Sequence, residues 1–291
     1  MTKDIQSIHH SFDRLGYVVD DELATVLFLM MKLRKPLLLE GNPGVGKTEI
    51  ANVLASYLDT ELIRLQCYEG LDVHSSIYEW NYQKQLLSIK IRENSAGTEI
   101  EKEKLIFGKD YILERPLLKA IMAKDKAPVL LIDEIDRADE EFEAFLLEML
   151  SANQISIPEL GTIKATHPPV VILTSNRTRE LSDALRRRCL YHWVDYPDPE
   201  KELKIVRKKL PEIEEQLARQ LVSVVQRLRT KGLDKSPGIS ETLDWAMSLQ
   251  ALGKKELDEQ SFSSTIGSLL KSNADITSIK SQGLSEILRV D

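Results

Sequence analysis

The chain has 291 residues, about twice the usual length of one domain, so a large domain with a smaller one is expected. Its 39 basic and 46 acidic side chains give a net charge of −7, which disfavours nonspecific binding to nucleic acid. With 42% hydrophobic and 29% charged residues, the composition is that of a folded globular protein and excludes disordered and collagen-like classes.

No stretch of the sequence stays apolar for the roughly twenty residues that a membrane-spanning helix needs. The longest mainly apolar stretch runs only from residue 23 to residue 31. The first residues lack the apolar run of a secretory signal, so a cytoplasmic location is expected. Cys67 and Cys189 belong to no CxxC or Cys/His pattern, and neither a disulfide framework nor a zinc site is expected.

Helices and strands alternate along the chain as far as residue 194, which predicts a parallel sheet covered by helices. Two N-terminal helices are predicted at residues 4–15 and 21–34. The elements predicted after them are a strand at 37–39, a helix at 47–58, strands at 62–66 and 129–133, a helix at 140–151, and strands at 170–174 and 190–194. The fold class predicted for this part is a three-layer α/β domain.

Two segments interrupt the alternation. Residues 92–104 are polar and lack apolar periodicity, which predicts a solvated insertion. Residues 154–157 and 162–165 flank a turn that contains proline and glycine, which predicts a hairpin over 154–165.

The alternation of helices and strands ends at residues 195–199, where two prolines occur. Beyond them the sequence predicts helices only. We therefore expect an α/β domain over residues 1–198 and a small all-helical domain over residues 199–291.

The segment GNPGVGKT at residues 41–48 fits the pattern GxxxxGK[ST] and lies between a predicted strand and a predicted helix, as that pattern requires. Its glycines let the backbone curl so that N–H groups face phosphate oxygens. Lys47 is expected to neutralise the β- and γ-phosphates of ATP, and Thr48 to offer a hydroxyl ligand to Mg²⁺. The expected nucleotide-binding residues are Gly41, Asn42, Pro43, Gly44, Val45, Gly46, Lys47 and Thr48. The alternative is a glycine turn that precedes a helix by chance.

The apolar strand at residues 129–133 ends in two carboxylates, Asp133 and Glu134. Because the carboxyl ends of parallel strands share one edge of a sheet, Asp133 is expected near the phosphate loop as a Mg²⁺ contact. Glu134 is suited to orient and deprotonate an attacking water. A strand that ends in Asp-Glu is by itself only a solvated strand end, and the phosphate loop is what favours the functional interpretation.

The segments GNPGVGKT, LLIDEIDRAD, ILTSN and DALRRRC resemble, in this order, the motifs of AAA+ ATPases. DEIDRAD is similar to the DEInRA signature of MoxR-type ATPases, and RPLLKAI and YHWVDYPDP resemble their CoxD-like branch. The resemblance covers about residues 20–250. It implies a P-loop ATPase with a helical lid that assembles into a ring-shaped homo-oligomer, a hexamer, with sites between subunits.

The resemblance also implies roles for residues after the last predicted strands. Asn176, at the end of ILTSN, matches the first sensor that positions the lytic water, and the alternative is an Asx turn that ends a strand. Arg188 best matches the arginine finger that enters a neighbouring subunit's site, with Arg187 second. The adjacent Arg186 leaves this assignment open, and a solvated basic face remains the plain alternative. The family's second-sensor arginine is absent, because glycine stands there at Gly238.

MoxR-type ATPases act as chaperones that mature metalloenzyme complexes, commonly with a von Willebrand factor A domain partner. The CoxD-like branch is associated with molybdenum hydroxylases of the carbon monoxide dehydrogenase type. The resemblance therefore implies a metalloenzyme client, met by the insertion and by the hairpin. A nucleic-acid-acting ATPase, clamp-loader-like or restriction-associated, is the second hypothesis, and the acidic net charge disfavours it. A nucleotide-binding scaffold that never hydrolyses ATP is the third.

Overall fold

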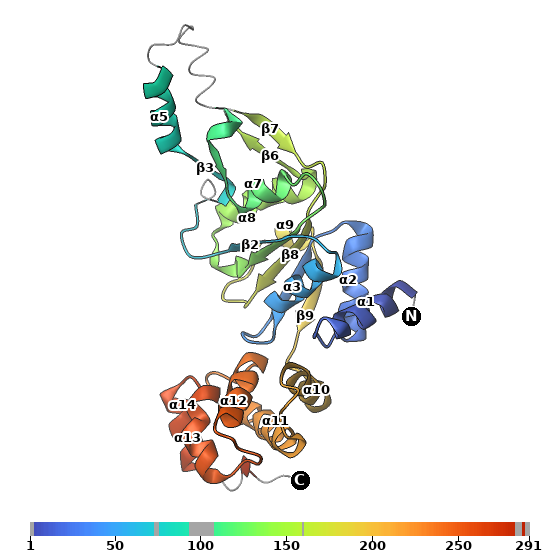
Figure 1. Cartoon of the computed structure of the whole chain (residues 1–291), viewed down its shortest axis with the longest axis vertical. Helices are drawn as coiled ribbons and strands as arrows, with labels where there is room; N and C mark the ends of the chain where they lie inside the picture. The colour runs from blue at the N-terminus through green and yellow to red at the C-terminus, as the bar shows by residue number, and fades with distance from the viewer. Residues whose placement is uncertain (1–2, 73–75, 93–107, 159, 283–286, 289–291) are drawn as a thin grey trace. The chain divides into compact units, whose positions relative to one another are not determined.

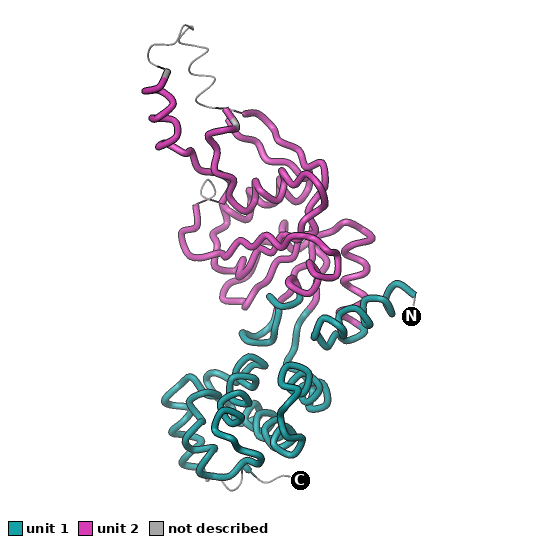
Figure 2. Tube along the Cα trace, in the orientation of Figure 1, with its two compact units in different colours: residues 1–21, 41–50, 193–291 teal, residues 22–40, 51–192 magenta. Residues whose placement is uncertain are grey.

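The computed structural model describes residues 3–72, 76–92, 108–158, 160–282 and 287–288 (Figure 1). The chain forms two compact units, each assembled from separate segments (Figure 2). The α/β unit, as we call it, consists of residues 22–40 and 51–192. The helical unit consists of residues 1–21, 41–50 and 193–291.

A five-stranded sheet in the order β2-β5-β8-β1-β9 supports the α/β unit (Figure 1). Its strands are β1 (Leu37–Gly41), β2 (Leu62–Gln66), β5 (Val129–Asp133), β8 (Val170–Ser175) and β9 (Leu190–Val194). The pairs β2/β5, β5/β8 and β1/β8 are parallel. All residues of β1 and β5 are buried, as expected for parallel strands covered on both faces. The predicted P-loop α/β fold with a parallel sheet is confirmed.

Helices cover the sheet, and their apolar faces make the core of the α/β unit. They are α2 (Asp21–Leu33), α3 (Lys47–Tyr57), α7 (Pro116–Ile121), α8 (Glu140–Ala152) and α9 (Asp183–Arg186). In the core, Phe142 and Leu146 of α8 belong to one apolar cluster with Leu130 and Ile132 of β5. Full burial of one such side chain contributes about 1.5–3 kcal/mol, so these contacts fix the direction in which β5 ends.

Two hairpins extend the α/β unit. The predicted one is confirmed, because β6 (Gln154–Ile157) pairs antiparallel with β7 (Gly161–Lys164). The second, β3 (Tyr78–Trp80) with β4 (Ile112–Glu114), was not predicted, since each strand has only three residues and long segments separate them. The described residues between these two strands include α5 (Tyr82–Arg92) and a 3-10 turn at Lys109–Tyr111. Residues 93–104 of the predicted insertion lie outside the described residues.

The helical unit contains α1 (Lys3–Arg14), α10 (Pro199–Lys209), α11 (Glu215–Arg229), α12 (Ile239–Ala251), α13 (Glu259–Leu269) and α14 (Asn273–Ser281). Its apolar core is centred on Trp245, whose ring meets the ring of Phe262 edge to face at 5.7 Å. The Trp245 indole N–H donates to the Thr265 hydroxyl at 2.8 Å, so the buried polar atom is satisfied. The predicted helical C-terminal region is therefore present. That residues 199–291 work as a separate lid stays a prediction.

One buried carboxylate joins three helices of this unit. Glu202 of α10 is fully buried and accepts hydrogen bonds from Arg229 of α11 at 2.7 and 2.8 Å. It also accepts from Gln226 at 2.7 Å and from Thr242 of α12 at 2.8 Å. Because a buried charge is tolerated only when it is fully paired, this cluster holds α10, α11 and α12 in one arrangement.

Candidate active site

Residues 41–48 form a tight loop between the end of β1 and the start of α3. Gly44 and Gly46 have φ values of +76° and +93°, which residues with side chains rarely adopt. The Lys47 side chain folds back across the loop, and its Nζ donates to the carbonyl oxygens of Gly41 at 2.7 Å and Asn42 at 2.9 Å. The loop thus has the glycine-dependent shape, with the ammonium group at its centre, that a phosphate cradle requires.

The start of α12 packs directly on this loop. A Cβ atom on Gly238 would lie 2.8 Å from backbone atoms of Gly44, and the Ser240 N–H donates to the Gly44 carbonyl at 3.2 Å. Gly238 occupies the position where the family resemblance implies a second-sensor arginine. The structure explains why this position is a glycine, because the backbone of Gly44 fills the space that a side chain would need.

Gly238→Ala is expected to destabilise the helical unit by about 1–3 kcal/mol, since the new methyl group forces α12 away from the loop. The measurement is thermal unfolding followed by circular dichroism. Gly267→Ala is the matched control, because a Cβ atom there meets nothing within 4 Å and alanine favours the surrounding helix α13. Equal melting temperatures for the two variants would contradict the packing argument.

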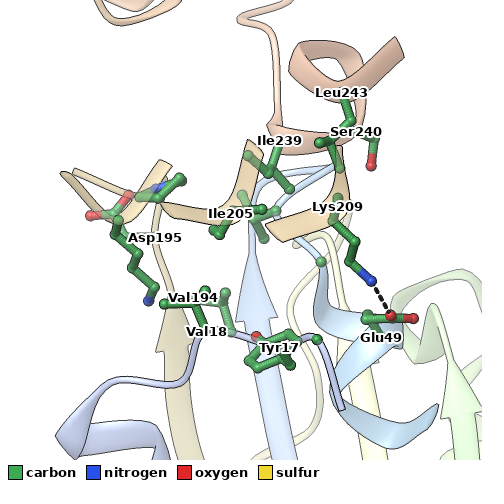
Figure 3. A pocket seen from close by; sticks show the side chains of 15 residues that line it. Tyr17, Val18, Glu49, Val194, Asp195, Ile205, Lys209, Ile239, Ser240 and Leu243 are labelled. Atoms are coloured by element: carbon green, nitrogen blue, oxygen red, sulfur yellow. Dashed lines mark hydrogen bonds and ion pairs between the residues drawn. The ribbon is translucent and has the colours of Figure 1, made fainter. Parts of the chain in front are cut away.

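A cavity of about 340 Å³ lies beside the loop within the helical unit (Figure 3). Its wall is largely apolar and includes Val18, Val45, Val194, Pro197, Ile205, Ile239 and Leu243. Tyr17 also lines it, and burial raises the pKa of the Tyr17 hydroxyl, which therefore stays neutral. An apolar cavity that shares Val45 and Gly46 with a phosphate cradle suits the base and sugar of a nucleotide.

Three lysines of α10 tie this helix to neighbouring segments of the same unit. Lys209 pairs with Glu49 of α3 at 2.9 Å beside the cavity (Figure 3), and Lys201 pairs with Asp20 at 2.6 Å. Lys208 pairs with Asp13, and this hydrogen bond holds the pKa of the Asp13 carboxyl below its usual value. Each exposed pair contributes at most about 1 kcal/mol, but together they orient α10 along the cavity wall.

In the α/β unit, β5 ends in two carboxylates with different environments. Asp133 is 3% exposed, and its Oδ1 accepts a hydrogen bond from the Thr174 hydroxyl at 2.5 Å. Its Oδ2 lies 2.5 Å from a guanidinium nitrogen of Arg64 on β2. Glu134 has a φ of +55°, and its N–H donates to the Thr174 hydroxyl at 2.9 Å. Left-handed backbone costs energy for a residue with a side chain, and such strain concentrates at functional sites.

A buried carboxylate that sequence reasoning missed lies at the end of β1. Glu40 is 6% exposed and accepts a hydrogen bond from the Ser175 hydroxyl of β8 at 3.2 Å. The Ser175 oxygen also accepts from the Arg177 N–H at 3.0 Å, which fixes the turn that contains Asn176. The available signal was a single charge at the end of an apolar strand, next to the glycine-rich loop.

The arginine cluster consists of Arg186, Arg187 and Arg188, and it lies at the carboxyl end of the short helix α9. Ser182 caps this helix, because its side chain accepts from the Leu185 N–H. The Arg188 Nε donates to the Ser151 hydroxyl of α8 at 2.9 Å. The Arg187 side chain is 83% exposed and approaches Asp183 only to 3.9 Å. Arg187 and Arg188 are thus both at the surface, and Arg188 is the more fixed of the two.

Residues 36–189 match the family model described as AAA domain (dynein-related subfamily), which is a little more than half of the chain. The chain belongs to this AAA family. The matched range contains the phosphate loop, Asp133, Glu134, Asn176 and the arginine cluster. Within the described residues, no helix of this AAA protein is long and apolar enough to cross a membrane.

An uncharacterized protein of Staphylococcus aureus (strain bovine RF122 / ET3-1) is 29% identical over 230 residues, which covers 77% of each chain. A solved mutant of Thermotoga maritima RuvB is 18% identical, with a TM-score of 0.52, and the match covers 88% of this chain and 71% of that one. The structure of the Thermotoga maritima RuvB Holliday junction branch migration motor matches with a TM-score of 0.47 and 18% identity, over 84% of this chain and 66% of its own. The match to the RuvB mutant, with its TM-score of 0.52, shows that the AAA protein shares the fold of RuvB.

Proposed function

We propose that the protein binds and hydrolyses ATP in the cytoplasm and uses this cycle to remodel a protein client. The phosphate loop carries the proposal, because a glycine-dependent cradle with a central lysine occurs in a chain of an AAA family. The buried Asp133 and the strained Glu134 support hydrolysis over simple binding.

The proposed ATP site uses the loop from Gly41 to Thr48 for the triphosphate. Backbone N–H groups of the loop and of the first turn of α3 donate to phosphate oxygens. Lys47 exchanges its contacts with the Gly41 and Asn42 carbonyls for contacts with the β- and γ-phosphates. The adenosine enters the apolar cavity that Val45 and Ile239 help to line.

The donor set at the site fits Mg²⁺, which prefers hard oxygen ligands and shares phosphate oxygens. The Thr48 hydroxyl and the Asp133 carboxylate are the residues that would hold it. When bound, the ion supplies positive charge that neutralises the triphosphate. To hold the ion, the Asp133 carboxylate would have to release its present contact with Arg64.

Glu134 is the proposed general base, and its side chain is 33% exposed and thus open to solvent. It accepts the proton of the attacking water, while Asn176 orients that water toward the γ-phosphate. Donors aimed at the charge that develops on the phosphate stabilise the transition state most. Arg188 or Arg187 of a neighbouring subunit is the proposed donor, and it completes the site in a hexameric ring.

Arg188→Ala is expected to lower ATP turnover by about 10³-fold, the low end for a trans arginine, without changing the nucleotide affinity of the separate subunits. Its control is Arg219→Ala, which removes an arginine that pairs with Glu215 on the surface of α11. Mixing Arg188→Ala with Glu134→Gln subunits is expected to restore part of the activity. In such a mixture Arg188 of a Glu134→Gln subunit can enter the site of an Arg188→Ala subunit, whose Glu134 is intact. Mixtures as inactive as the separate variants would argue against an arginine acting between subunits.

The proposed client is a metalloenzyme of the molybdenum hydroxylase or carbon monoxide dehydrogenase type, reached together with a von Willebrand factor A domain protein. This proposal rests on the resemblance of DEIDRAD, RPLLKAI and YHWVDYPDP to the CoxD-like branch of MoxR-type ATPases. No further observation favours a nucleic-acid substrate, since the likeness to RuvB extends to the fold alone and the net charge is −7.

Capture from native lysate tests the client. The bait is Glu134→Gln with Mg-ATP bound. The matched control bait is Lys47→Ala, which is expected not to bind Mg-ATP. Enrichment of a von Willebrand factor A domain protein and a metalloenzyme subunit on the first bait alone is the expected result. Enrichment instead of DNA that resists nuclease and high salt would contradict the proposal and favour a nucleic-acid-acting ATPase.

A further inference from the structure

The buried carboxyl group of Glu40 has no part in the proposed ATP site. Glu40 lies in β1, between β8 and β9 of the sheet, and it directly precedes the phosphate loop in the chain. Its exposed fraction is 6%, in a strand whose residues are all buried. A buried carboxyl group is unfavourable unless polar groups satisfy its oxygens, so the partners of Glu40 indicate what the side chain does.

Two hydroxyl groups, one from each neighbouring strand, contact this carboxyl group. The Ser175 hydroxyl of β8 donates to Glu40 Oε1 at 3.2 Å, and the two residues are direct partners in the register of β1 and β8. The Tyr191 hydroxyl of β9 also forms a hydrogen bond with the Glu40 side chain. Burial and the Glu40 carboxylate raise the pKa of the Tyr191 hydroxyl, which therefore stays protonated and donates.

The Ser175 oxygen connects Glu40 to the turn that contains Asn176. Besides donating to Glu40, this fully buried oxygen accepts a hydrogen bond from the Arg177 N–H at 3.0 Å. A hydroxyl group has one proton and two lone pairs. Because the proton of Ser175 is committed to Glu40, a lone pair stays directed at the Arg177 N–H, and the hydrogen bond spans Asn176.

The backbone of this turn needs such support. Arg177 has a φ of +59°, a left-handed conformation that is unfavourable for a residue with a side chain. Without the Ser175 contact, Arg177 is expected to relax, and the direction of the preceding Asn176 side chain changes with it. A misplacement of about 1 Å in a group that orients a reactant can lower a rate about a hundredfold.

We propose that Glu40 is a positioning residue for Asn176. Its buried carboxyl group orients the Ser175 hydroxyl, which holds the turn and so aims the Asn176 amide at the attacking water. This inference rests on the proposed function, in which Asn176 orients that water. Glu40 itself contacts neither ATP nor the water in this role, so it affects the rate of hydrolysis and not the affinity for nucleotide.

Hydrogen exchange of the full-length protein, followed by mass spectrometry, tests the structural step without nucleotide. Glu40→Leu removes the acceptor and suits a buried strand. We expect the segment that contains the Arg177 N–H to exchange at least about fivefold faster in Glu40→Leu. Glu40→Gln retains one acceptor oxygen for Ser175, and its exchange is expected to be closer to the wild-type rate. Unchanged exchange in Glu40→Leu would overturn the proposal, whether or not the protein hydrolyses ATP.

Ser175→Ala removes the same contact from the other side, and it replaces Glu40→Leu in these measurements if that variant does not fold. It is expected to speed exchange at Arg177 to the same extent. Unchanged exchange in Ser175→Ala would likewise overturn the proposal.

ATP turnover tests the consequence for Asn176. We expect Glu40→Leu to lower kcat about tenfold or more and to leave the KM for ATP within about threefold of the wild-type value. In an Asn176→Ala background the same substitution is expected to have no further effect, because it acts through Asn176. Tyr191→Phe is the matched control, since it removes the other hydroxyl and keeps the Ser175 contact, and its kcat is expected to stay at the wild-type value.

The outcomes separate this inference from the proposed function. A higher KM with unchanged kcat in Glu40→Leu, or an equal loss of kcat in Tyr191→Phe, would overturn the positioning role. So would a full additional loss in the Asn176→Ala background. No turnover in the wild-type protein would contradict the proposed function, and the positioning role in hydrolysis with it, while the exchange rate at Arg177 still decides the structural step.

Discussion

Lys47→Ala is expected to abolish measurable ATP binding, with a rise in Kd of at least about a hundredfold. The ammonium group is the one cation at the centre of the described loop, and each charge-assisted hydrogen bond to phosphate contributes about 1.5–3 kcal/mol. Titration calorimetry with Mg-ATP measures the change.

Two controls separate lost phosphate contacts from a collapsed loop. Lys47→Met keeps the apolar stem of the buried side chain without its charge. It is expected to lose ATP binding as completely as Lys47→Ala. Lys126→Ala removes an exposed lysine that pairs with Asp59, and its affinity for ATP is expected to stay at the wild-type value. Near wild-type binding by Lys47→Met would show that the charge is dispensable and that the loop is not a phosphate cradle.

Glu134→Gln is expected to bind Mg-ATP within about threefold of the wild-type affinity and to hydrolyse it about 10²–10⁴-fold more slowly. Glutamine has nearly the same shape and keeps the backbone contact to Thr174, but it cannot accept a proton from water. Single-turnover hydrolysis of bound ATP, followed by separation of ATP from ADP, measures the chemical step directly.

Glu141→Gln is the matched control for this variant, because Glu141 is an exposed residue in the first turn of α8. It is expected to hydrolyse ATP at the wild-type rate. A wild-type rate in Glu134→Gln would remove Glu134 from the role of base and leave its strained backbone without a catalytic explanation.

The sheet was predictable because its strands are short apolar runs bounded by turn residues. The predicted bounds of β2, β5 and β9 agree with the structure. All residues of β5 are buried on both faces of the sheet, whereas β2 alternates buried residues with exposed ones. The hairpin of β3 and β4 was missed for the opposite reason. Strands of three residues carry no recognisable alternation, and their pairing depends on contacts between distant segments.

Three residues of the candidate site could be placed from sequence because they stand at the boundaries of predicted elements. Lys47 begins α3 after the glycine-rich loop, Asp133 ends β5, and Asn176 follows β8 directly. The contacts that surround them were not predictable. Arg64 reaches Asp133 from a strand 69 positions earlier, and no local pattern marks that pair. Gly238 was noted from sequence only as a missing arginine, whereas the structure gives it a packing role against Gly44.

The rate of phosphate release from Mg-ATP by the wild-type protein, measured over a range of protein concentrations, tests the central claim most directly. The account predicts steady turnover that rises more than linearly with protein concentration, because subunits complete each other's sites, and that falls to background in Lys47→Ala. Tight ATP binding without phosphate release at any concentration would contradict the account and identify a nucleotide-binding scaffold instead.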